Sequence, residues 1–239
     1  MKTEQTKQNE TEIIKDKARP LPSVMPGAIN WPYPDYSKIF EIASAGPPLA
    51  DLWELSPIRF TDAASHVEEL IDQLFPGKPL LCCAPSPQEP QTRPREAWRG
   101  RLADLSFIVP NPMTALTGKI LDDKLSPCCL DNTGPRRFLV VEFDETILEL
   151  DKQAAILWHL QRYGPLTLVV HSGMKSLQGW FFCAGEPEEK LIKFFRYAVH
   201  LSADENLWSK CQLCRLPDGL CANGNRQFVY YFNPQTIQV

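Results

Sequence analysis

Two acidic residues, Glu142 and Asp144, stand two positions apart at the end of an apolar, β-branched run. Successive side chains of a strand point to opposite faces, so both carboxylates are expected on one face, while Val140, Val141 and Phe143 anchor the strand. Such oxygen ligands suit Mg²⁺ or Mn²⁺, ions that support phosphoryl transfer. The alternative is a strand that runs into an acidic turn and binds no metal.

A second group of polar residues lies in the segment His171–Trp180. Gly173 allows a tight turn between two strands. Ser172, Lys175 and Ser176 would then present hydrogen-bond donors that suit a triphosphate. An ordinary hairpin with a solvated lysine is the alternative for the same residues.

A third carboxylate, Asp204, is predicted just past the end of a helix. The dipole at a helix C-terminus does not stabilise a negative charge, so this side chain is expected to have another partner. A metal ion is one candidate, and a nearby backbone amide is the other.

Four arginines surround a tryptophan within ten residues: Arg93, Arg95, Trp98, Arg99 and Arg101. Guanidinium groups beside an aromatic ring suit a nucleic-acid backbone with a stacking platform. Because the net charge of the chain is −4, nucleic-acid binding through bulk charge is excluded, and a local basic groove would be required. Solvated loop charges are the alternative.

Hydrophobic periodicity predicts a mixed α+β fold with four parts. These are a disordered arm (1–19), a Pro- and aromatic-rich extended segment (20–50), an N-terminal α/β lobe (51–136) and a core (137–239). In the lobe we expect a helix at 63–75 and strands at 79–84 and 105–109. In the core we expect strands at 138–143, 166–170, 176–183 and 226–232, with helices at 148–163 and 187–202.

The predicted core therefore has the order β-α-β-β-α-β. This is the split βαβ arrangement of ferredoxin-like and RNA-recognition-motif (RRM-like) folds. The strand 138–143 is then expected near the middle of the sheet, with both helices on one face.

The 239 residues include no apolar run near the about 20 that cross a bilayer, and no hydrophobic signal core at the start. A cytoplasmic protein without a membrane partner is the expectation, and its eight cysteines are expected as reduced thiols. Cys211, Cys214 and Cys221 supply part of a zinc ligand set, but a closed structural zinc site requires four ligands. The sequence therefore leaves open whether these cysteines bind zinc.

Taken together, four segments resemble the archaeo-eukaryotic primase superfamily, the primase-polymerases, and most closely primase-like proteins of bacteria and their mobile elements. They are Val141–Glu145, Ser172–Phe181, Arg215–Gly219 and Asn223–Pro234. The resemblance is strongest over 137–234. One departure stands at Gln178, where the family has a histidine that contacts nucleotide phosphates; glutamine donates a hydrogen bond but carries no charge.

The resemblance implies a metal-dependent nucleotidyltransferase that makes primers, or extends a strand on a template, in DNA replication. Its expected metal ligands, for Mg²⁺ or Mn²⁺, are Glu142, Asp144 and Asp204. Its expected nucleotide-binding residues are Ser172, Lys175, Ser176, Gln178, Arg215 and Arg226. The implied partners are a single-stranded DNA template and (d)NTPs. A separate replicative helicase is also expected, because the chain contains no P-loop sequence.

Two other functions remain open at this point. A non-catalytic nucleic-acid-binding module would keep the fold and the acidic pair but lack turnover, as the change at Gln178 suggests. A metal-dependent nuclease or nicking enzyme shares the topology, but it requires a His-hydrophobic-His pair that this sequence does not contain.

Overall fold

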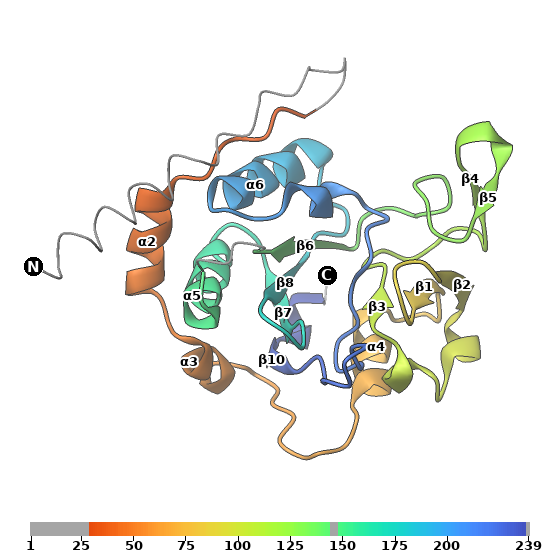
Figure 1. The fold of residues 1–239 in the computed structure, drawn as a ribbon, viewed down its shortest axis with the longest axis horizontal. Helices are drawn as coiled ribbons and strands as arrows, with labels where there is room; N and C mark the ends of the chain where they lie inside the picture. The colour runs from red at the N-terminus through yellow and green to blue at the C-terminus, as the bar shows by residue number, and fades with distance from the viewer. Residues whose placement is uncertain (1–28, 144–147, 238–239) are drawn as a thin grey trace, which may run out of the picture. The chain divides into compact units, whose positions relative to one another are not determined.

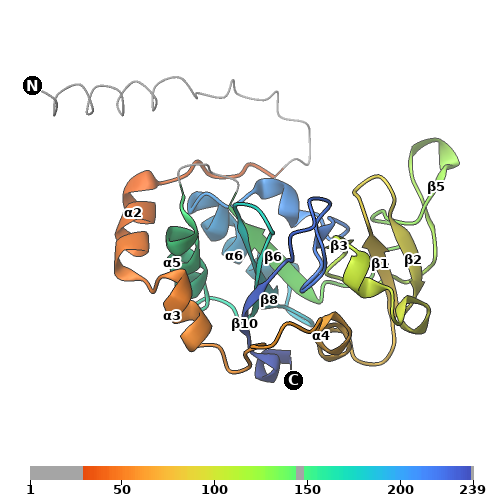
Figure 2. The ribbon, with the colours of Figure 1, turned by 60° about the horizontal axis from the view of Figure 1, so that its bottom comes forward.

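The computed structural model describes residues 29–143 and 148–237. Contacts divide the chain into the units Met1–Asn30 and Trp31–Val239, and the description below concerns the second (Figures 1 and 2). The predicted arm 1–19 lies outside the described residues. No helix in the described part of the chain combines the length and the apolar character needed to span a membrane.

The unit has a mixed α+β fold around an antiparallel sheet. Its strands are β6 (Phe138–Glu142), β7 (Leu166–His171), β8 (Leu177–Phe182) and β10 (Val229–Phe232), in the order β10-β7-β8-β6. The expectation that 138–143 lies near the middle is wrong, because β6 is at one end of this sheet. The turn at Gly173, where φ is +79°, makes β7 and β8 neighbours. Strand β10 pairs with the other edge of β7 rather than with β6, so β6 pairs with β8 alone.

Two helices, α5 (Leu150–Leu160) and α6 (Glu188–His200), cover one face of this sheet, as expected. Gly179 of β8 lies so close to α5 that an added Cβ would be 2.5 Å from Leu157 Cδ2. Phe181, two residues on and therefore on the same face, packs against Phe194 of α6 with ring centroids 4.9 Å apart. Glycine at 179 therefore leaves room for the Leu157 side chain of α5 against the strand.

The other face of the sheet packs against the N-terminal lobe. Phe75 follows helix α4 (Val67–Leu74) and contacts Phe138 of β6 edge-on at 5.8 Å. The lobe holds a second antiparallel sheet in the order β2-β1-β3-β9. Its strands are β1 (Leu80–Ala84), β2 (Gln91–Pro94), β3 (Phe107–Ile108) and β9 (Cys214–Arg215).

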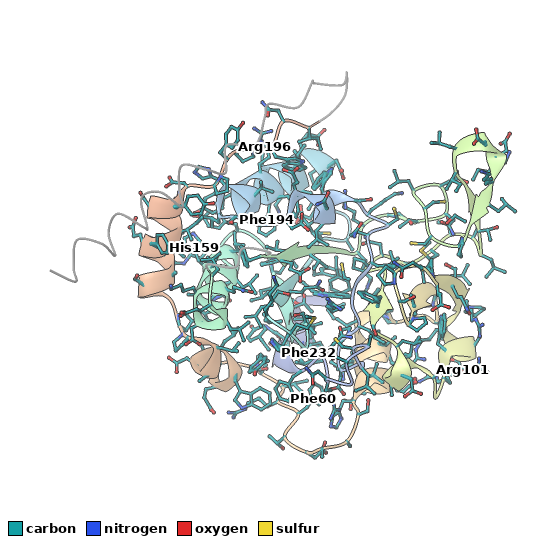
Figure 3. All side chains as sticks on the ribbon, viewed as in Figure 1. Phe60, Arg101, His159, Phe194, Arg196 and Phe232 are labelled. Carbon is teal, nitrogen blue, oxygen red and sulfur yellow. The ribbon has the colours of Figure 1, made fainter. Side chains whose placement is uncertain are left out.

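Strand β9 crosses the domain boundary expected at 136/137. It lies in the C-terminal half of the sequence, yet it pairs with β3 of the N-terminal lobe through Phe107 and Arg215. Contacts accordingly place both halves in one compact unit. Phe60 and Phe232 join the halves again, with stacked rings 6.2 Å apart (Figure 3).

Smaller elements complete the unit. A separate two-stranded ribbon is formed by β4 (Gly118–Lys119) and β5 (Leu125–Ser126). Short 3₁₀ helices are η1 (Arg95–Trp98), η2 (Leu102–Asp104), η3 (Leu121–Asp123), η4 (Glu205–Trp208) and η5 (Pro234–Ile237).

The expectation of an extended segment over 20–50 is wrong for its second half. Residues Tyr36–Ala45 form helix α2, and α3 (Leu49–Glu54) begins directly after Pro48. The prolines flank α2 rather than interrupt it. Asp35 caps its first turn by accepting a hydrogen bond from Lys38 N at 3.1 Å, and Ile39 is buried.

Arg95 and Trp98, which the sequence suggested as nucleic-acid contacts, belong to the core. The Arg95 side chain is fully buried, with Nε 2.9 Å from Asp72 Oδ1 and Nη2 2.6 Å from Glu68 Oε2. The buried Trp98 indole donates to the Leu81 carbonyl at 3.1 Å. The expectation is therefore wrong for these two residues: an arginine and an indole with internal partners stabilise the lobe.

We predict that Arg95→Met lowers the free energy of unfolding by about 2–4 kcal/mol, because it leaves Glu68 and Asp72 without their buried partner. The matched variant Arg101→Met, at an exposed position, should change it by no more than about 0.5 kcal/mol. Urea unfolding at pH 7 measures both values. Equal effects of the two substitutions would contradict the structural role of Arg95.

The effect of Arg95→Met should also depend on pH. Burial alone would raise the pKa of Asp72, but hydrogen bonds and charge from Arg99 and Arg95 outweigh it and hold that pKa below its ordinary value. A carboxyl with a lowered folded pKa contributes stability above its unfolded pKa and loses it as the pH falls through the folded pKa. The difference between wild type and variant should therefore shrink in acid.

Candidate active site

Glu142, the last residue of β6, has its carboxylate held by two side chains of the neighbouring hairpin. Ser176 Oγ donates to Oε1 at 2.6 Å, and Gln178 Nε2 donates to Oε2 at 2.8 Å. The antiparallel register places Glu142 directly opposite Gln178, which explains why the two side chains meet on one face. The carboxylate is half-buried and fixed in orientation.

Gln178 links this carboxylate to the second sheet. Its amide nitrogen binds Glu142, and its amide oxygen accepts a hydrogen bond from the backbone nitrogen of Arg215 in β9 at 2.8 Å. The side chain is buried, and both ends of its amide have protein partners. The expectation that Gln178 binds nucleotide phosphates is not supported by this placement, because the amide bridges β8 and β9 instead.

Asp204 reaches the same place through its backbone. Its amide donates to the carbonyl of Glu142 at 2.9 Å, so the start of η4 lies beside the end of β6. Its own carboxylate caps η4 by accepting from the backbone and side-chain nitrogens of Asn206, at 3.0 and 2.8 Å. Of the two partners considered from the sequence, the backbone amide is the one observed.

Asp144, the other expected metal ligand, lies outside the described residues. Within the residues that are described, no three His, Cys, Asp or Glu side chains gather as a metal-binding group. Glu142 and Asp204 are thus the two expected ligands whose placement is known, and they come from distant parts of the sequence to the same end of β6.

The hairpin turn uses its serines internally. Ser172 is buried, and its Oγ accepts from the backbone nitrogen of Ser176 at 3.1 Å, which closes the turn. Ser176 Oγ is engaged by Glu142. Neither hydroxyl is directed to solvent as the triphosphate expectation required. Lys175 is exposed at the tip of the turn and is the member of this group that can meet a phosphate.

The two C-terminal arginines have different surroundings. Arg226 pairs with Asp218 and also donates to the carbonyls of Ala63 and Ala64, so it joins the two halves of the unit. This placement corrects the expectation that Arg226 contacts template or triphosphate. Arg215 is half-buried, with its guanidinium over the ring of Phe107 at 4.9 Å.

The rest of the arginine-rich stretch is divided between packing and solvent. Arg99 Nη1 pairs with Asp72 Oδ2 at 2.6 Å, and Arg93 lies over the Trp98 ring at 5.0 Å. Arg101 is exposed. The stretch therefore stabilises its own lobe. Of the residues predicted to contact nucleic acid, Arg93 and Arg101 retain the most freedom to bind it.

The three cysteines considered for zinc are not assembled around a common point. Cys221 Sγ donates to the carbonyl of Ser172 at 2.9 Å, and Cys211 Sγ lies 3.3 Å from Ser209 Oγ. Burial raises the pKa of the Cys214 thiol well above its ordinary value, which disfavours the thiolate that zinc requires.

Gln153, a residue of α5 that positions the β7–β8 hairpin, was not identified from the sequence. This buried residue of α5 accepts from Leu177 N at 2.8 Å and donates to the carbonyls of Leu148 and Lys175 at 2.8 and 3.2 Å. Its contacts tie the chain before α5 to the start of β8. The available signal was a glutamine next to the apolar run 154–157 of a predicted helix.

Comparison with known proteins leaves the site to be judged on its own geometry. The chain matches no protein-family model, and neither the curated proteins nor the solved structures include a significant match.

We predict that Gln178→Leu lowers the free energy of unfolding by about 1–3 kcal/mol, because it leaves an oxygen of the half-buried Glu142 carboxylate and the Arg215 backbone amide without a partner. Gln212→Leu, at an exposed position shortly before β9, is the matched control and should be nearly neutral. Urea unfolding provides both values. A neutral Gln178→Leu would refute the bridging role.

Proposed function

We propose that the protein is a metal-dependent nucleotidyltransferase of the primase-polymerase class, acting on a single-stranded DNA template with (d)NTPs. One observation carries the proposal. A carboxylate at the end of β6 is held rigidly by Ser176 and Gln178, and a second acidic residue, Asp204, is joined to it through the backbone. Preorganised carboxylates at a strand end suit phosphoryl transfer.

The fold proposed for this function is a split βαβ core related to RRM-like folds, in which β10 pairs with β7 and β6 therefore lies at one end of the sheet. The order β6-α5-β7-β8-α6-β10 supports it, and so do β6 and β7, which each run antiparallel to β8 on either side of it. A cytoplasmic location and a separate helicase partner belong to the same proposal and derive from the sequence itself, whereas a mobile-element origin derives from the resemblance.

The donors present are compatible with Mg²⁺ or Mn²⁺. Each carboxylate oxygen has two acceptor directions, and each Glu142 oxygen uses one of them for a protein hydrogen bond. Asp204 adds a half-buried carboxylate. When bound, the metal would neutralise phosphate charge and activate the attacking hydroxyl. Glu142 and Asp204, with Asp144, are its proposed ligands.

Other side chains of the site would position the carboxylate and contact the nucleotide. Ser176 and Gln178 hold the Glu142 carboxylate in one orientation, so that little reorganisation is needed when substrate binds. Lys175, exposed at the turn that begins β8, can bring positive charge to a nucleotide phosphate. Arg215 supplies a second cation from β9, anchored by Phe107 and by the Gln178 bridge.

One observation favours a non-catalytic nucleic-acid-binding module as the second candidate. The position where primases have a phosphate-binding histidine holds Gln178, and both ends of its amide are used within the protein. A site with this residue lacks one cationic phosphate contact. The two candidates differ in turnover, so an assay of nucleotide incorporation separates them.

We predict that wild-type protein incorporates nucleotides on a primed single-stranded template with Mn²⁺ or Mg²⁺, and that Glu142→Gln lowers the rate at least about 100-fold by removing a metal-binding carboxylate. Glu149→Gln, an exposed glutamate after β6, should leave the rate unchanged. Primer extension and de novo synthesis assays give the rates, and calorimetry gives Mn²⁺ affinity.

Two results would contradict the proposal. Equal rates for Glu142→Gln and Glu149→Gln would show that Glu142 is not part of the catalytic site. A folded wild type that binds single-stranded DNA but incorporates no nucleotide with either metal would favour the non-catalytic module.

A further inference from the structure

A group of aromatic and cationic side chains lies on the helix layer, away from the site described above. It comprises Lys38 of α2, His159 of α5, Arg162 and Tyr163 just after α5, and Tyr197 of α6. We refer to these five residues as the helix-face cluster. Three segments that are distant in sequence contribute to it, and Figure 3 labels His159 within this layer.

The rings of the cluster hold one another in place. Tyr163 and Tyr197 contact edge-on, with centroids 5.0 Å apart, and His159 Nε2 lies 2.8 Å from the Tyr197 hydroxyl. Lys38 Nζ is 4.8 Å from the centre of the Tyr197 ring. Tyr163 remains 53% exposed, so this ring is fixed from one side and open to solvent on the other.

The charge of the cluster is positive. Within the described residues, neither Lys38 nor Arg162 lies within ion-pair distance of a carboxylate, whereas Arg95, Arg99 and Arg226 all do. Burial, followed by the charges of Arg162 and Lys38, lowers the pKa of His159 and so favours the neutral form of that ring. Two cations therefore remain available to an anionic ligand.

Other exposed rings lie on or beside α2. In the described part of the chain, the exposed aromatic side chains are Tyr33, Tyr36, Phe40 and Tyr163. Three of them lie on or just before α2, which packs against α5, and Lys152 Nζ approaches the Phe40 ring at 5.7 Å. The exposed rings of the described residues thus belong to the helix layer and to the segment just before it.

This layer is on the opposite side of the sheet from Glu142. Gln178, which binds Glu142, and Gly179, which faces α5, are consecutive residues of β8 and so point to opposite faces. A ligand on the helix-face cluster would therefore be separate from one at the carboxylate site. The inference goes beyond the proposed reaction, because it does not require the carboxylates.

We propose that the helix-face cluster binds single-stranded nucleic acid, with Lys38 and Arg162 contacting backbone phosphates and a base stacking on Tyr163. Positive charge beside open aromatic faces is the chemistry by which proteins bind single strands without sequence preference. An acidic polypeptide would match the charge, but it offers no flat ring for Tyr163. The open ring favours the nucleic acid over the peptide.

The test is the fluorescence anisotropy of labelled oligo(dT) titrated with full-length protein in EDTA, where metal-dependent binding is removed. Tyr163→Ala and Arg162→Glu should each weaken binding about fivefold or more, since base stacking and phosphate contacts each supply affinity of that order. Tyr163→Phe keeps the stacking face and should bind as wild type does. Thermal unfolding of each variant verifies that it is folded.

Two controls separate this inference from the proposed function. Lys124→Glu changes an exposed lysine of the β4–β5 ribbon, which lies at the opposite end of the unit from α5 in Figure 1, and it should leave the affinity unchanged. Glu142→Gln should also leave it unchanged in EDTA, whatever that variant does to nucleotide incorporation. Weaker binding by Glu142→Gln alone would place the strand at the carboxylate site and overturn the inference.

The remaining outcomes are equally decisive. Wild-type affinity for Tyr163→Ala and Arg162→Glu, or no binding of oligo(dT) by the wild type, would overturn the proposal. Displacement of oligo(dT) by poly-glutamate, together with an unaffected Tyr163→Ala, would assign the surface to an acidic protein instead. Loss of binding on Arg162→Glu and Tyr163→Ala, with retention in Tyr163→Phe, would support it.

Discussion

The burial of β8 on both faces is the constraint on which the rest of the structure depends. All six of its residues are buried, so its sheet requires a cover on each side. Gly179 and Phe181 pack under α5 and α6, whereas Trp180 and Phe182 meet Phe138 on the other face. Two-sided burial therefore requires the N-terminal lobe to pack on the sheet, and the pairing of β9 with β3 links the same two halves a second time.

Burial also determines the chemistry of Gln178. A buried amide must have partners for its nitrogen and its oxygen, since an unpaired one costs about 1–3 kcal/mol. Glu142 and the Arg215 backbone are those partners. The same two hydrogen bonds orient a carboxylate and connect the two sheets. A change in the position of the lobe would therefore change the orientation of the Glu142 carboxylate.

Local sequence patterns predicted where the strands and helices lie in the sequence better than they predicted which strands pair with one another. The alternating and helical periodicities gave the strands 138–142, 166–171 and 177–182 and helices α5 and α6 within a few residues. The place of β6 at one end of the sheet depends on pairing between distant strands, which periodicity does not encode. Arg95 resembled a surface cation because its partners, Glu68 and Asp72, lie more than twenty positions away. Among the site residues, Glu142 could be predicted from its two-residue spacing to Asp144. Gln153 could not be predicted, because its partners Leu177 and Lys175 become its neighbours only in the folded chain.

One sheet thus separates two kinds of surface. On the lobe side, an oriented carboxylate favours cations, and on the helix side Lys38 and Arg162 lack acidic partners within the described residues. A net charge of −4 conceals this division, because formal charges are summed without regard to position. The strand alternation that puts Gln178 and Gly179 on opposite faces produces it. A polyanion in contact with Glu142 would be repelled by that carboxylate unless a metal ion were bound there, whereas Lys38 and Arg162 would attract a polyanion without a metal.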